Sequence, residues 1–134
     1  MTTIRATMQT SDVWNHLKTE DDLPEGFTFR GTLPTDPDGI ETMLEAWNAG
    51  TSEPPHSHPG DDMTIICEGE MRVQFYNIDD GTLIKDGPEE IYVEGDTAYI
   101  HKGQIHSVKY VKDCRLVYIH SGTFDFIESD LPVA

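Results

Sequence analysis

Three histidines carry the strongest chemical signal in this sequence. His56 and His58 are separated by one residue in the run GTSEPPHSHPGDD, which spans Gly50 to Asp62. Alternate side chains of an extended chain share a face, so these two imidazoles project into the same space. Pro54 and Pro55 stiffen the chain before them and lower the entropic cost of holding both rings in place. The run predicts half of a metal site.

The third histidine is His106. It follows the glycine turn at Gly103 and stands at the start of a predicted strand. That position suits a ligand that reaches the site from a neighbouring strand. Three imidazoles together indicate a divalent transition metal ion, because imidazole nitrogen is a preferred donor for such ions.

The elements that must position these histidines are short strands. From Glu25 onward β-rich runs recur between clusters of Gly, Pro, Asp and Asn, a pattern typical of an all-β sandwich or barrel. No helical stretch alternates with the runs, so a parallel β/α sheet is excluded. Closing an antiparallel sheet into a barrel removes its edges and leaves a mouth for a ligand. The predicted strands are Phe27–Leu33, Thr42–Asn48, Met63–Glu68, Met71–Asn77, Glu90–Val93, Thr97–Ile100, Ile105–Val111 and Arg115–His120.

The segment before the strands has a different pattern. Ser11–Thr19 places Val13, Trp14 and Leu17 on one helical face, behind a Ser or Thr that can cap it. We therefore expect a short N-terminal helix within a helical extension, residues 1–25. Residues 26–134 are expected to form one β-barrel domain, since a chain of 134 residues has room for one core.

Charge narrows the choice of partners. The chain has 25 Asp and Glu against 9 Lys and Arg, a formal net charge of −16. Such a surface repels phosphate backbones and anionic lipids, so we expect no nucleic-acid and no membrane partner. No apolar run approaches the roughly 20 residues that span a bilayer, and Met1–Thr10 lacks a signal-peptide pattern, so a cytoplasmic location is expected. Cys67 and Cys114 form no CxxC pair and are interpreted as structural thiols.

The two histidine segments resemble the two motifs of the cupin superfamily, G-x5-H-x-H-x3,4-E-x6-G and G-x5-P-x-G-x2-H-x3-N. Asp62 stands where the first motif has glutamate. In the second motif His101 replaces the proline and Tyr110 replaces the asparagine. The positions identical to the motifs are Gly50, His56, His58, Gly69, Gly95, Gly103 and His106.

This resemblance implies a cupin-type double-stranded β-helix, or jelly-roll barrel, that holds one iron, manganese, nickel, copper or zinc ion. The implied ligands are the three histidines and one carboxylate, for which Asp62 is the candidate. Aspartate is one methylene shorter than glutamate, so binding through water and orientation of a ligand histidine remain alternatives. Asp61 is a second candidate, although strand alternation points it away if Asp62 faces inward. Either arrangement leaves open coordination positions, which are typical of catalytic metals.

Three further side chains are candidates near the site. Tyr110 shares strand parity with His106, so we expect its hydroxyl to face the metal cavity and name it as the candidate catalytic residue. His101 is interpreted as a solvated turn residue, with a pocket role as the alternative. Period-2 alternation points His120 toward the interior, where we interpret it as a hydrogen-bonded core histidine, with a substrate contact as the alternative.

These features favour a metalloenzyme that acts on a small organic substrate. Dioxygenase chemistry leads, with isomerase and lyase chemistry as alternatives, since the metal would polarise a chelating oxygen or activate dioxygen. A non-catalytic small-molecule-binding cupin is the alternative from another class, because one fold hosts many functions. A metal-free barrel would leave the histidine spacing coincidental. The resemblance also implies a homodimer, with the stretch before Phe27 and the tail Thr123–Ala134 as candidate interface segments.

Overall fold

The computed structural model describes residues 14, 17, 24–32 and 39–134, and residues 30–32 by backbone alone. The predicted helix Ser11–Thr19 lies outside the described residues except for Trp14 and Leu17. The Arg115 guanidinium lies 5.6 Å from the centre of the Trp14 ring. In the described part of the chain, no helix is long and apolar enough to cross a membrane.

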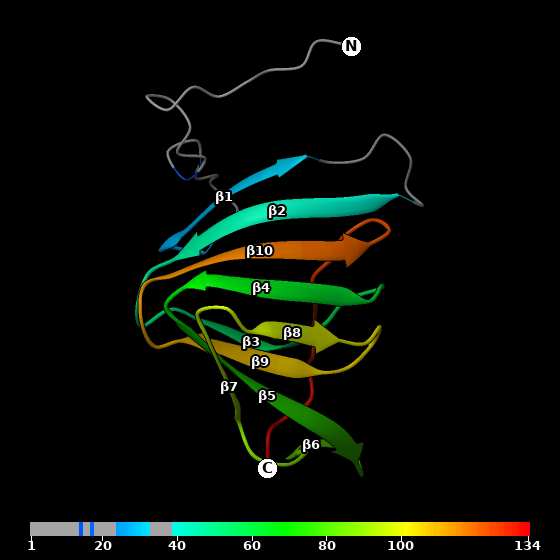
Figure 1. Cartoon of the computed structure of the whole chain (residues 1–134). Helices are drawn as coiled ribbons and strands as arrows, with labels where there is room; N and C mark the ends of the chain where they lie inside the picture. Colours follow the sequence, from blue (N-terminus) through cyan, green and yellow to red (C-terminus); the bar gives the residue numbers. More distant parts are fainter. Residues whose placement is uncertain (1–13, 15–16, 18–23, 33–38) are drawn as a thin grey trace, which may run out of the picture.

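The described residues form two antiparallel sheets, which Figure 1 shows one above the other. One sheet has the order β1-β2-β10-β4-β8, and the other has the order β11-β3-β9-β5-β6 with β7 paired to β5. The all-β prediction is therefore confirmed. The strands are β1 (Phe27–Thr32), β2 (Ile40–Trp47), β3 (Ser52–Ser57), β4 (Asp62–Glu68), β5 (Glu70–Asp79), β6 (Thr82–Lys85), β7 (Glu90–Val93), β8 (Thr97–Ile100), β9 (His106–Tyr110), β10 (Cys114–Ser121) and β11 (Ile127–Glu128).

Alternating burial along the strands builds the interior between the sheets. Every second residue of β10 is buried, and the same alternation runs along β2. At one end of the interior the Trp47 ring stacks on Phe27 at 4.2 Å and on Tyr110 at 4.4 Å, measured between ring centres. These large rings close that end of the barrel with apolar surface. The histidines lie elsewhere in the interior.

Three short strands were not predicted from the sequence, and β3 matters most because it carries His56. Its two prolines have no N–H to donate, which normally argues against a strand. The pairing of β3 with β9 accordingly shifts register between Glu53 and His56. β6 follows a tight turn at Asp80 and Gly81, both with positive φ (49° and 74°), as a two-residue hairpin requires. β11 has only two residues, both exposed.

Candidate metal centre

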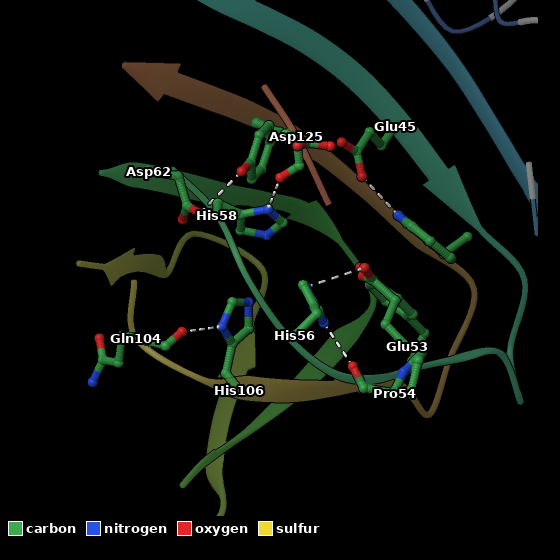
Figure 2. A network of polar contacts seen from close by, with 12 residues as sticks. Glu45, Glu53, Pro54, His56, His58, Asp62, Gln104, His106 and Asp125 are labelled. Carbon is green, nitrogen blue, oxygen red and sulfur yellow. Dashed lines mark hydrogen bonds and ion pairs between the residues drawn. The ribbon is translucent and has the colours of Figure 1, made fainter. Parts of the chain in front are cut away.

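The three histidines converge from two neighbouring strands. His56 on β3 and His106 on β9 are direct partners in the strand register, and His58 follows the end of β3. One ligand nitrogen from each ring lies within 4.8 Å of the other two. Figure 2 shows the rings turned toward one another, and all three side chains are buried.

Each of the three rings is fixed by a backbone carbonyl. Nδ1 lies 2.6 Å from the Pro54 oxygen in His56, 2.8 Å from the Asp125 oxygen in His58, and 2.9 Å from the Gln104 oxygen in His106. A carbonyl only accepts, so each Nδ1 carries the proton and donates. The Nε2 atom of each ring is left with a free lone pair, which is the form that binds a metal ion.

Burial keeps these rings neutral. Burial first, and the neighbouring imidazoles second, lower the pKa of His56 to about 3 and that of His106 to about 4. The pKa of His58 is also lowered, mainly by burial. All three imidazoles are therefore neutral near neutral pH, and Nε2 need lose no proton to bind a metal ion.

The chain after β10 covers this cluster with aromatic rings. The Phe126 ring stacks on His56 at 4.1 Å, and the Phe124 ring lies 5.0 Å from His58, measured between ring centres. The Asp125 carbonyl between them accepts the His58 hydrogen bond. This segment shields the imidazoles from solvent. No periodic pattern marks it in the sequence, so its contact with the histidines was not predicted.

Among the described residues, the Glu53 carboxylate lies nearest to a free imidazole nitrogen. Its Oε2 lies 3.6 Å from His56 Nε2, and its Oε1 accepts a 2.9 Å hydrogen bond from the Tyr110 hydroxyl. Burial, and to a smaller extent the charge of Asp62, raise its pKa to about 7, against the hydrogen bond from Tyr110, which lowers it. When the carboxyl is ionised, two acceptors face each other at 3.6 Å, an arrangement that a cation would stabilise. Sequence reasoning missed this residue.

Asp62 lies on the opposite sheet, in β4. Its Oδ2 accepts a 3.0 Å hydrogen bond from the Tyr118 hydroxyl, and among the described residues its buried Oδ1 has no partner. Burial raises the pKa of this carboxyl to about 7. The described residues that could share one metal ion are His56, His58 and His106, without Asp62.

The buried carboxylate of Glu45 on β2 accepts a 2.9 Å hydrogen bond from Trp47 Nε1. Burial and then the Glu53 charge raise its pKa to about 8. Like Glu53, it was not predicted as part of the interior chemistry.

Of the other residues that the sequence named near the site, Tyr110 and His120 lie in the interior and His101 lies on the surface. Tyr110 is buried and shares the inward face with His106, as its parity predicted, but its hydroxyl contacts Glu53. His101 is exposed in the turn after β8, as expected of a solvated residue. His120 is fully buried and faces inward. Its interpretation as a hydrogen-bonded core histidine is wrong for one nitrogen, because Nε2 has no partner among the described residues.

The chain belongs to the cupin family. The family model for the cupin domain matches residues 43–122, which include all three clustered histidines and both sequence motifs. A search of curated proteins finds no significant match.

Solved structures with the same fold include enzymes and a protein of similar size. A cupin superfamily protein from Desulfitobacterium hafniense gives a TM-score of 0.64 at 14% identity, over 88% of this chain and 94% of its own. A variant oxalate decarboxylase from Bacillus subtilis gives 0.60 at 18% identity, over 75% and 26%. Salicylate 1,2-dioxygenase from Pseudoaminobacter salicylatoxidans gives 0.59 at 13% identity, over 74% and 26%. These likenesses show a shared fold.

Proposed function

We propose that this chain is a metal-dependent enzyme acting on a small organic molecule, with one divalent transition metal ion held by His56, His58 and His106. The observation that carries the proposal is the convergence of three neutral imidazoles whose Nδ1 atoms already donate to carbonyls. Such donors suit iron, manganese, nickel, copper or zinc. Dioxygenase chemistry is the leading reaction, followed by isomerase and lyase chemistry. Cupin-fold structures that include a decarboxylase and a dioxygenase support this range.

We further propose that Glu53, rather than Asp62, supplies the carboxylate next to the ion. Glu53 Oε2 is 3.6 Å from the Nε2 atom of His56. Asp62 lies on the opposite sheet, where one of its oxygens already accepts a hydrogen bond from Tyr118 of the neighbouring strand. Tyr110 then has a positioning role, because its hydroxyl holds the second oxygen of Glu53. Asp62 would then not be a metal ligand.

Several residues of this chain would support the bound ion. Three backbone carbonyls fix the imidazole rings, Tyr110 orients Glu53, and Phe124 and Phe126 exclude water from the histidine cluster. A bound ion would supply Lewis acidity at its open coordination positions, to polarise a chelating oxygen or to activate dioxygen. A pre-set, water-poor surrounding strengthens each of these electrostatic interactions.

The proposal is tested first by the metal content of protein purified without chelator or metal-affinity tag. We expect about one transition metal ion per chain, because the described residues contain one cluster of three imidazoles. Oxygen consumption is then measured on the metal-loaded protein with phenolic, thiol and keto-acid substrates, and product analysis detects isomerase or lyase turnover. A metal-loaded protein that binds these compounds but turns over none of them is a small-molecule binder.

The homodimer stays a prediction. Met63 and Tyr99, which pair across β4 and β8, and the nearby Ile65 expose large apolar side chains on the outer face of the sheet. Such a face is the kind that a second copy of the chain can cover.

A further inference from the structure

Two buried polar atoms in the described part of the chain have no hydrogen-bond partner: Asp62 Oδ1 and His120 Nε2. The two residues are 2% and 0% exposed. Leaving such an atom unpaired costs its full desolvation penalty, so native interiors rarely keep one without a use. Two of them close together indicate a place where a ligand group, not the protein, completes the hydrogen bonding.

These atoms belong to one built arrangement. Asp62 on β4 and His120 on β10 are direct partners in the antiparallel register, which places their side chains on the same face with Cβ atoms about 4.5–5.5 Å apart. Each residue is held through its other polar atom: Tyr118 donates to Asp62 Oδ2 at 3.0 Å, and His120 Nδ1 lies 3.1 Å from the Gly122 oxygen.

The same contacts define what the free atoms can bind. The Gly122 carbonyl only accepts, so His120 carries its proton on Nδ1 and offers a lone pair at Nε2. In its ionised form the Asp62 carboxylate offers a second acceptor at Oδ1. Gly60 packs against the His120 ring so closely that a Cβ there would lie 3.2 Å from Nε2. The pair is therefore a confined double acceptor, suited to a group that donates hydrogen bonds.

The pair lies beside the proposed metal centre. The His120 and His58 rings are 6.1 Å apart, measured between their centres. Over the described residues, the buried polar side chains include Glu41, Glu45 and Asp62 but no lysine or arginine. An anionic group entering this interior would meet carboxylates without a cationic partner apart from the metal ion. A neutral or cationic group would not be repelled.

We propose that Asp62 and His120 form a substrate-recognition subsite that accepts hydrogen bonds from a hydroxyl or amino group of a neutral or cationic small molecule. This inference rests on the proposed function, because the metal centre beside the subsite would bind the other end of the same molecule. It assigns the substrate to donor-bearing compounds and excludes small dicarboxylates, which carry two negative charges and no donor.

Three probes of similar length test the subsite on protein loaded with Co²⁺, whose visible absorption reports binding near the metal. Dihydroxyacetone is neutral and offers a metal-binding carbonyl with two hydroxyl donors. Its dimethyl ether, 1,3-dimethoxyacetone, keeps the carbonyl and loses both donors, and malonate is a small dicarboxylate that has two negative charges and no donor. We expect dihydroxyacetone to bind at least about tenfold more tightly than either, the effect of hydrogen bonds to a charged group. Equal binding of the three probes would overturn the proposal.

Two variants then locate the effect. Asp62→Asn and His120→Phe should each weaken dihydroxyacetone binding about tenfold and leave the Co²⁺ content and the spectrum of the ligand-free protein unchanged. His101→Phe, the same replacement at an exposed histidine, is the matched control and should change nothing. Unaltered dihydroxyacetone binding in both variants contradicts the subsite. If a variant fails to fold, the three-probe comparison on the unsubstituted protein still decides.

The outcomes separate this inference from the proposed function. Failure of the protein to take up Co²⁺ would defeat the proposed metal centre. Stoichiometric Co²⁺ with no preference among the probes would defeat the donor subsite alone.

Discussion

The two inner faces of the barrel carry histidines that are prepared in the same way but grouped differently. On the β3 and β9 face, His56 and His106 use Nδ1 to bind carbonyls and lie with their free nitrogens close to each other. On the β4 and β10 face, His120 also uses Nδ1 to bind a carbonyl, but its register partner is Asp62. A fixed tautomer leaves Nε2 as an acceptor. The strand register then determines which side chain lies next to that nitrogen.

This difference gives the two faces different tasks. Imidazoles that meet other imidazoles make a set of metal donors, whereas an imidazole that meets a carboxylate makes a pair of hydrogen-bond acceptors. On this proposal, the opposed sheets of one small barrel would hold the metal centre and the recognition pair within one interior.

The largest expected effect comes from replacing one histidine on each face by alanine. His106→Ala should lower the affinity for Zn²⁺ more than about 100-fold, because removing a ligand costs more than the 10–100-fold seen on removing a partner of a ligand. His120→Ala should keep an affinity close to that of the unsubstituted protein. Competition with a chromophoric chelator measures both values. Equal losses in the two variants would abolish the distinction between the faces.

Replacing the carboxylates of Glu53 and Asp62, one near each face, should have a smaller effect on Zn²⁺ affinity. Glu53→Gln should weaken Zn²⁺ binding about 10–100-fold, because it removes the charge beside His56 while keeping an acceptor for the Tyr110 hydroxyl. Asp62→Asn, on the other face, should change the affinity much less. The same chelator competition measures both. The reverse ranking would return the carboxylate position to Asp62, as the sequence motif predicts.

Much of this architecture could be predicted from the sequence. Strand alternation placed His106 and Tyr110 on one inward face, and the spacing of His56 and His58 predicted that both rings would reach the same space. The cupin family and the β-barrel also followed from the motif residues. These predictions succeeded because they depend on local periodicity and on glycines at tight contacts. At Gly69, for example, a Cβ would lie 2.1 Å from the Asp113 oxygen.

Glu53 could not be predicted by the same rule. It stands three residues before His56, so regular alternation would place the two side chains on opposite faces. The register shift at Pro54 and Pro55 changes that parity and brings the carboxylate beside the ring. The orphaned Nε2 of His120 was missed for a related reason, since hydrogen-bond partners depend on how distant strands meet.

The smallest effect concerns Glu45, whose pKa burial raises from 4.5 to about 8. Between these pH values the folded state holds more protons than the unfolded state, so the free energy of unfolding falls as the pH rises toward 8. The histidines have lowered pKa values and act in the opposite direction, around and below their unfolded pKa of about 6.5, so they offset part of the decline just above pH 6.5. From pH 6.5 to 8 the decline therefore comes from buried carboxylates, and above about pH 7 mainly from Glu45.

Urea unfolding of the metal-free protein at pH 6.5 and pH 8 measures this decline, which should be about 1–2 kcal/mol. Glu45→Gln keeps an acceptor for Trp47 Nε1 and removes the ionisation, so most of the decline should disappear. Glu94→Gln, in an exposed turn, is the matched control and should leave it intact. If the free energy of unfolding declines equally in Glu45→Gln and in the unsubstituted protein, another group holds the titrating proton. If the decline disappears in Glu45→Gln alone, the loss of stability with rising pH belongs to a carboxylate outside both the proposed metal centre and the proposed recognition pair.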